Sequence, residues 1–166
     1  MRKNVSLTVL VLLLVVLGLA SRAAADVKLA GVFGDHMVLQ REAPLPVWGW
    51  ADPGEKVTVA LADQTKSATA DSSGRWSVRL DAMKAGGPHT LRIQGNSTIE
   101  KSDVLVGEVW LCSGQSNMAM TVGGVLNKEA EIAAADHPQV RMITVGRTPA
   151  DQPQNDCQGE WQVCSP

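Results

Sequence analysis

Apolar and polar residues alternate in short runs between residues 26 and about 106, as in strands that bury one face. In one run, Val57, Val59 and Leu61 fall on the same side, with small or polar residues between them. Seven runs of strand length are predicted: Met37–Gln40, Leu45–Trp50, Lys56–Ala62, Thr65–Ala70, Arg75–Leu80, His89–Gln94 and Thr98–Lys101. Segments rich in Asp, Gly and Pro separate them. The pattern predicts an all-β antiparallel sandwich over residues 26–106.

The alternation of apolar and polar residues ends at Gly107. The apolar run Val109–Cys112 is expected to form a buried strand, and Ser113–Asn117 ends it. The elements expected next are a brief helical turn at Asn117–Thr121, a helix at Lys128–Asp136 capped by Asn127 and ended by Pro138, and a strand at Val140–Val145. Strand, helix and strand predict a β-α-β unit in a parallel sheet, the start of an α/β domain over residues 107–166.

A hydroxyl group therefore follows the end of a predicted strand. Ser116 would lie at the carboxyl edge of the sheet, where backbone N–H groups of the following turn can face a developing oxyanion. Gly114 would let the chain turn, and Gln115 and Asn117 would shape the turn or the substrate pocket. Ser113 is an alternative nucleophile, nearer the strand. An ordinary strand-to-loop junction also fits these residue types.

The segment Gly107–Met118 reads GEVWLCSGQSNM, and it resembles the nucleophile block of the sialate O-acetylesterases, members of the SGNH (GDSL-like) hydrolase superfamily. Asp35–Arg41 (DHMVLQR), Pro46–Ala51 and Pro53–Val59 resemble the N-terminal β-domain of the same esterases. The resemblance implies a sandwich followed by the first β-α-β part of an SGNH-type hydrolase domain. It also implies an esterase that acts on O-acetylated sialic acid or another acetylated glycan through Ser116.

A serine needs a neighbouring base to become a good nucleophile. In the family that the chain resembles, that base and its Asp come from a D-x-x-H block, and no His of this chain has Asp three residues before it. His137 is a poor substitute, because it falls at a predicted helix end. We therefore expect the chain to stop inside its second domain and to carry the nucleophile without its base. The chemistry requires neither metal nor organic cofactor.

The first 25 residues have the pattern of an export signal. Arg2 and Lys3 precede an apolar stretch from Leu7 to Ala20, and Ala23–Ala25 offers a cleavage site. An uncleaved membrane anchor is the alternative, although the stretch is short for a bilayer span. Cleavage predicts a secreted or periplasmic protein with no membrane association.

Composition narrows the possible partners. Apolar residues make up 45% of the chain and charged residues 19%, which is typical of a globular protein. The formal net charge is -2, and Lys and Arg are dispersed, so a nucleic-acid partner is not expected. The five Trp residues would supply most large core side chains: Trp48, Trp50, Trp76, Trp110 and Trp161.

A second function remains open from the sequence. Trp48, Trp50, Arg75 and Trp76 can form a sugar-stacking platform, in which case the sandwich would be a non-catalytic glycan-binding module. The competing interpretation places these Trp side chains in the core of a small domain.

Three cysteines are an odd number for an exported chain. Cys157 and Cys164 are close enough in sequence to close a small loop, which would leave Cys112 as a buried thiol. No C-x-x-C pair and no His at ligand spacing accompany them, so a metal site is not predicted.

Overall fold

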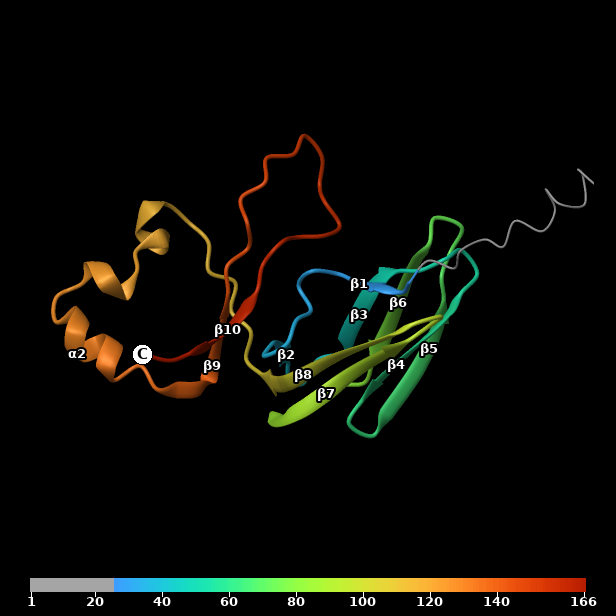
Figure 1. The fold of residues 1–166 in the computed structure, drawn as a ribbon, viewed down its shortest axis with the longest axis horizontal. Helices are drawn as coiled ribbons and strands as arrows, with labels where there is room; N and C mark the ends of the chain where they lie inside the picture. The colour runs from blue at the N-terminus through green and yellow to red at the C-terminus, as the bar shows by residue number, and fades with distance from the viewer. Residues whose placement is uncertain (1–25) are drawn as a thin grey trace, which may run out of the picture.

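The computed structural model describes residues 26–166 and consists mostly of β-strands with little helix (Figure 1). The predicted export signal, residues 1–25, lies outside the described residues. Between residues 26 and 166, no helix is long and apolar enough to cross a membrane. The strands are β1 (Lys28–Leu29), β2 (Val38–Gln40), β3 (Leu45–Trp50), β4 (Lys56–Leu61), β5 (Gln64–Thr69), β6 (Arg75–Leu80), β7 (Gly86–Gln94), β8 (Thr98–Gly107), β9 (His137–Ile143) and β10 (Trp161–Cys164). The helices are the 3-10 helices η1 (Ser116–Ala119) and η2 (Val122–Gly124) and the α-helix α2 (Lys128–Ala133).

Two sheets make up the first part of the chain. The strand order is β1-β3-β6 in the smaller sheet and β2-β8-β7-β4-β5 in the larger. Neighbouring strands are antiparallel except β2 and β8, which run parallel. All seven predicted strands of this region are present. β7 begins earlier than predicted, at Gly86, and β8 continues to Gly107, where its last three residues pair with β2.

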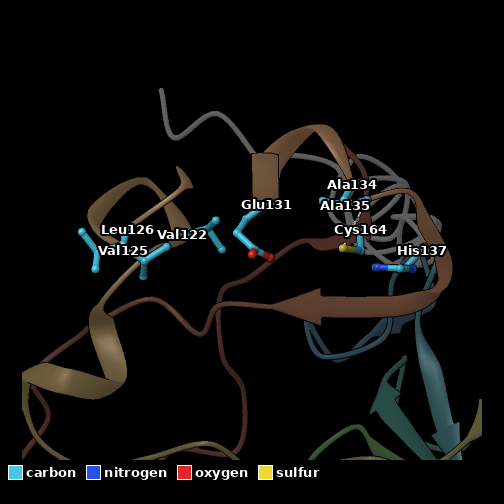
Figure 2. Close-up of a pocket in the computed structure, with 8 residues that line it drawn as sticks. All are labelled: Val122, Val125, Leu126, Glu131, Ala134, Ala135, His137 and Cys164. Atoms are coloured by element: carbon cyan, nitrogen blue, oxygen red, sulfur yellow. Dashed lines mark hydrogen bonds between the residues drawn. The ribbon is translucent and has the colours of Figure 1, made fainter. Parts of the chain in front are cut away.

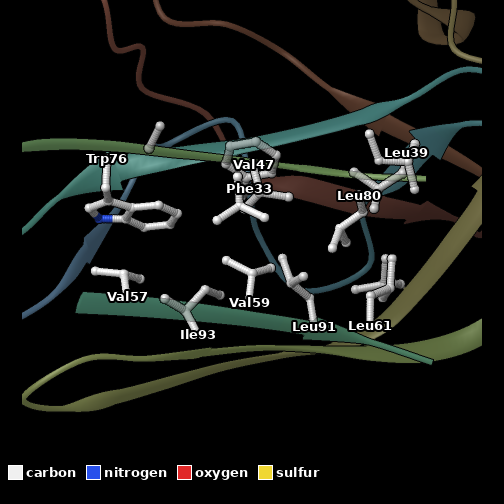
Figure 3. Packing of buried hydrophobic residues seen from close by; sticks show 14 of the residues in the cluster. Phe33, Leu39, Val47, Val57, Val59, Leu61, Trp76, Leu80, Leu91 and Ile93 are labelled. Carbon is white, nitrogen blue, oxygen red and sulfur yellow. The ribbon is translucent and has the colours of Figure 1, made fainter. Parts of the chain in front are cut away.

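The alternating apolar residues meet between the two sheets. Val57, Val59 and Leu61 of β4 are at most 1% exposed, as the pattern predicts. Figure 3 shows Trp76 of β6 facing the side chains of β4 across this core. Burial of such side chains contributes about 25 cal/mol per Å² of apolar surface, which makes this core the main source of stability.

The turn between β5 and β6 has the conformation that its residues predict. The Oδ1 atom of Asp71 accepts hydrogen bonds from the backbone N–H groups of Ser73 and Arg75, at 2.8 and 3.0 Å. Gly74 has a φ of +79°, and a Cβ atom there would lie 2.6 Å from the carbonyl oxygen of Ala51. Glycine is therefore required at this position both by conformation and by space.

The predicted β-α-β unit is not formed. Val109–Cys112 is not a strand, and Trp110 and Leu111 are 82% and 95% exposed. β9 pairs with β10, and this pairing is antiparallel. The physical reason is the lack of a pairing strand. Among residues 26–166 no strand lies beside 109–112 to accept and donate its backbone hydrogen bonds, so the apolar run stays exposed.

The predicted helix and the second predicted strand are present with other bounds, and other local predictions in this region are wrong. α2 ends at Ala133, before the predicted Asp136, and β9 begins at His137. Asn127 precedes α2 with a φ of +59°, and its side chain makes no capping hydrogen bond. Cys112 is exposed instead of buried, and Trp110 contributes nothing to the core.

The cysteines are not cross-linked. Cys157 and Cys164 are both free thiols, so the predicted small disulfide loop is absent from the structure. Cys164 lies in β10, where its thiol donates a hydrogen bond to the carbonyl oxygen of Ala135 at 3.4 Å. The two thiols therefore have separate environments.

An ionic cluster joins β9 to the larger sheet. The carboxylate of Asp103 accepts hydrogen bonds from Arg141 Nη1 at 2.6 Å and pairs with His36 Nδ1 at 2.7 Å. The Arg141 side chain is only 5% exposed, and its Nε donates to the carbonyl oxygen of Pro138. His36 and Asp103 both have positive φ, 65° and 52°, a conformation that non-glycine residues rarely adopt. The cluster therefore holds two strained backbone positions in place.

A second set of contacts docks the region around β10 onto the loop after β1. The indole N–H of Trp161 donates to the carbonyl oxygen of Val32 at 2.8 Å. The backbone N–H of Gly31 donates to Asp156 Oδ1 at 2.7 Å. A Cβ atom on Gly31 would collide with the carbonyl oxygen of Cys157, so glycine permits this close approach.

We predict that Leu91→Ala lowers the free energy of unfolding by about 2 to 5 kcal/mol, because Leu91 is fully buried and its truncation leaves a cavity. Leu111→Ala is the matched control, since Leu111 is 95% exposed, and it should change stability by less than about 0.5 kcal/mol. Urea unfolding followed by circular dichroism measures both. A large loss in the control would mean that residues 109–112 are buried in solution.

A second prediction concerns acid stability. Hydrogen bonds from Arg141 and then His36 lower the pKa of Asp103 from its ordinary value of 3.8 to about 2. The stabilisation from this carboxylate is therefore fully present above pH 4 and is lost as the pH falls through 2. Asp103→Asn should cost about 1 to 3 kcal/mol at neutral pH, and its difference from wild type should shrink as the pH approaches 2.

Urea unfolding at a series of pH values tests this dependence. Asp63→Asn, which alters an exposed carboxylate in the turn after β4, is the control and should show no such trend. A difference between Asp103→Asn and wild type that stays constant down to pH 2 would contradict the prediction.

Candidate active site

Ser116 is the first residue of η1, a short 3-10 helix. Gln115 precedes the helix in an extended conformation, and its carbonyl oxygen accepts a hydrogen bond from the N–H of Met118 at 2.9 Å. The predicted helical turn is therefore present, although no strand leads into it. Every residue of η1 is exposed, Ser116 included.

The residues around Ser116 form the turn mainly through backbone contacts. A Cβ atom on Gly114 would lie 2.9 Å from Cγ of Met118, so a larger side chain there would require Met118 to move. The carbonyl oxygen of Asn117 accepts a hydrogen bond from the N–H of Met120 at 3.3 Å. No side-chain cap holds the N-terminal end of this turn. Its conformation therefore depends on local backbone geometry.

Ser116 has no base within the described part of the chain. Its hydroxyl makes no hydrogen bond with any His between residues 26 and 166. His36 pairs with Asp103, and His137 begins β9. An unassisted serine hydroxyl is a weak nucleophile, so these residues alone do not activate it.

A shallow pocket of about 390 Å³ lies between η2, α2 and the ends of β9 and β10. Figure 2 shows its lining residues: Val122, Val125, Leu126, Glu131, Ala134, Ala135, His137 and Cys164. The pocket is mostly apolar and does not include Ser116. Within residues 26–166 there is no group of three or more His, Cys, Asp or Glu side chains placed to hold a metal ion.

A polar cluster lies where the chain leaves β8 toward Ser116. Arg41 Nε donates a hydrogen bond to Glu108 Oε1 at 2.6 Å, and Gln40 Nε2 donates to Glu108 Oε2 at 3.2 Å. The N–H of Val109 donates to Gln40 Oε1 at 2.9 Å. The hydrogen bonds from Arg41 and then Gln40 lower the pKa of Glu108.

The tryptophans proposed as a sugar platform are largely occupied in packing. Trp76 is 3% exposed and lies in the core. Trp48 and Trp50 are half-buried against the core, and the Trp48 ring packs edge-on against Phe33 at 4.7 Å between ring centroids. The arrangement agrees with the core interpretation of these side chains.

The polar contacts of the 35–41 segment could not be found by local spacing. Arg41 and Glu108 are separated by 67 residues, and so are His36 and Asp103. The one sequence signal for these contacts is the family resemblance, because Asp35–Arg41 and Gly107–Met118 are two of the segments that carry it. The fold brings these two segments together through the pairing of β2 with β8.

The chain is similar to known proteins in sequence and in structure. The chain is 34% identical to a sialate O-acetylesterase of Mus musculus, over 88% of this chain and 29% of that protein. It is 38% identical to the sialate O-acetylesterase of Homo sapiens, over 81% of this chain and 28% of that protein. Its structure matches that of a carbohydrate acetylesterase from Xanthomonas citri with a TM-score of 0.82 and 38% identity, over 84% of this chain and 33% of that one. No protein-family model matches the chain.

The chain spans 28 to 30% of the length of the curated relatives that it matches. The sequence relatives are sialate O-acetylesterases, and the structural neighbour is a carbohydrate acetylesterase. The identities, 34% and 38%, are well above those at which only the fold is shared. The predicted resemblance is thereby confirmed: over most of its length, this chain is homologous to the sialate O-acetylesterases.

Proposed function

We propose that this chain forms part of a carbohydrate O-acetylesterase with Ser116 as the nucleophile. The observation that carries the proposal is the combined similarity, in sequence and in structure, to esterases that act on acetylated sugars. The position of Ser116 at the start of a tight, exposed turn also supports it, because such a hydroxyl can be approached by an ester. The substrate class is an O-acetylated sialic acid or another acetylated glycan.

In the proposed mechanism, Ser116 Oγ attacks the carbonyl carbon of an O-acetyl group. Its proton passes to a base, the sugar hydroxyl leaves, and water hydrolyses the resulting acetyl-enzyme. The backbone N–H of Ser116 would stabilise the oxyanion, while Gly114, Gln115 and Asn117 set the shape of the turn. The proposal requires a His base, with its Asp, from polypeptide outside residues 26–166.

We further propose that residues 26–106 form a β-sandwich domain and that residues 107–166 contribute the nucleophile-bearing part of an SGNH-type hydrolase domain. The exposed apolar side chains support a larger hydrolase domain: Val109, Trp110, Leu111, Met118, Met120, Val122, Val125, Leu126, Ile132, Val140, Met142 and Val145. An apolar surface this extensive normally faces other protein. The signal pattern of residues 1–25 supports export, to the periplasm or the exterior.

We predict that Ser116→Ala abolishes both deacetylation of an O-acetylated sugar and covalent labelling by a serine-directed fluorophosphonate. The measurement is made on the product of the complete reading frame, because activation requires the base. Ser113→Ala is the matched control: it removes a hydroxyl three residues away and should retain most of the labelling. The reverse pattern would make Ser113 the nucleophile and contradict the assignment.

Residues 26–166 alone are expected to hydrolyse 4-nitrophenyl acetate little or not at all. The reason is that Ser116 has no hydrogen-bonded base within these residues. Release of 4-nitrophenol by the purified fragment, compared with its Ser116→Ala variant, measures this. Turnover that is lost in the variant would show that the fragment supplies its own base.

A further inference from the structure

The segment Asp35–Arg41 is held along the second half of β8 by hydrogen bonds and strand pairing. Asp35 Oδ1 accepts hydrogen bonds from the N–H and hydroxyl of Ser102, at 2.6 and 2.9 Å. β2 then pairs in parallel with β8, with Val38 opposite Leu105 and Gln40 opposite Gly107. Met37 and Leu39 of this segment are buried in the core, and its polar side chains contact β8 or the residues that follow it.

Gln40 and Arg41 contact three consecutive residues of the chain as it leaves β8. The N–H of Arg41 donates to the carbonyl oxygen of Gly107 at 2.8 Å, and its Nε donates to Glu108. The Gln40 amide uses both ends, donating to Glu108 and accepting from the N–H of Val109. We call these four residues, Gln40, Arg41, Glu108 and Val109, the clamp.

The clamp is the last fixed point before the turn that contains Ser116. Within the described residues, no hydrogen bond ties Trp110–Gly114 to the rest of the protein. A fully extended segment from Val109 to Ser116 reaches about 23 Å, so the point at which Val109 is held limits where the hydroxyl can lie. The contacts at Glu108 and Val109 therefore restrict the position of Ser116.

The clamp contributes little as a stabilising ion pair. The side chains of Arg41 and Glu108 are 38% and 50% exposed, and pairs this exposed add little to the free energy of folding. Its geometry is nonetheless specific. The Glu108 carboxylate accepts hydrogen bonds from Arg41 and Gln40, and Gln40 also accepts one from the N–H of Val109. Such an arrangement fixes orientation more than it adds stability.

We propose that Gln40 and Arg41 are positioning residues for the nucleophile. They hold Glu108 and Val109 and thereby fix where, and in which direction, the segment carrying Ser116 leaves β8. This inference rests on the proposed function, in which Ser116 is the attacking residue. Neither residue touches the substrate. Gln40 acts through the backbone N–H of Val109, and Arg41 acts through the carbonyl oxygen of Gly107 and the carboxylate of Glu108.

Amide hydrogen exchange on the full chain tests the clamp itself. Gln40→Ala and Arg41→Gln should each raise the exchange rate at Val109 by about tenfold, since a protecting hydrogen bond is lost or loosened, while Leu91 in the core keeps its protection. Arg92→Gln is the matched control, because it breaks another half-exposed ion pair, between Arg92 of β7 and Glu100 of β8. Unchanged exchange at Val109 in both clamp variants would overturn the proposal.

Esterase kinetics on the product of the complete reading frame test the positioning. Both clamp variants should lower kcat by about tenfold and leave KM within about twofold, because a shift of the nucleophile affects the reaction more than substrate binding. Arg41→Lys keeps the charge and should recover part of kcat, and Arg92→Gln should match wild type. Equal loss in all variants, or a change in KM alone, would refute a positioning role.

The two measurements separate the inference from the proposed function. If the wild-type protein hydrolyses no acetyl ester and Ser116 is not labelled, the proposed function fails, and the positioning role falls with it. The wild-type protein can instead be active while the two clamp variants keep its kcat and exchange faster at Val109. In that case the clamp exists and the positioning role alone is wrong. Faster exchange at Val109 together with a lower kcat in the clamp variants supports both the proposed function and the positioning role.

Discussion

The pairing of β8 on both of its edges is the interaction on which the rest of the structure depends. β8 pairs antiparallel with β7 along most of its length and parallel with β2 at its end, so it cannot move without disrupting the larger sheet. Its buried residues, Val104 and Val106, fix it to the core. The chain therefore leaves the two sheets from a rigid strand, and both the ionic cluster at Asp103 and the clamp at Glu108 are built on that strand.

The sequence predicts the two-sheet part well because its elements are decided locally. Alternation in β4 and β6 and the turn at Asp71–Gly74 each depend on residues within a few positions, and the structure has all of them. The strand ends were less accurate. β8 extends to Gly107 because β2, far away in sequence, pairs with it, and no local pattern contains that information.

After Gly107 the predicted helix and second strand are present with other bounds, but the predicted buried strand at Val109–Cys112 is not formed, for a physical reason. An apolar run such as Val109–Cys112 indicates burial, but burial requires neighbours, and among residues 26–166 no sheet lies beside it. The turn at Ser116 was predictable, because Gly and Asn favour it locally. The clamp and the Asp103 cluster were not, because they depend on side chains that the fold brings together from segments 67 residues apart.

The parallel pairing of β2 with β8 also has a consequence for the order of folding. The hairpin of β4 and β5 closes over a short turn at Ala62 and Asp63, whereas Arg41 and Glu108 lie 67 residues apart in the chain. Loop closure over such a separation costs more entropy, so we expect local hairpins to form first and the junction with Glu108 to form late. The segment that carries Ser116 would then become anchored only after both sheets have assembled.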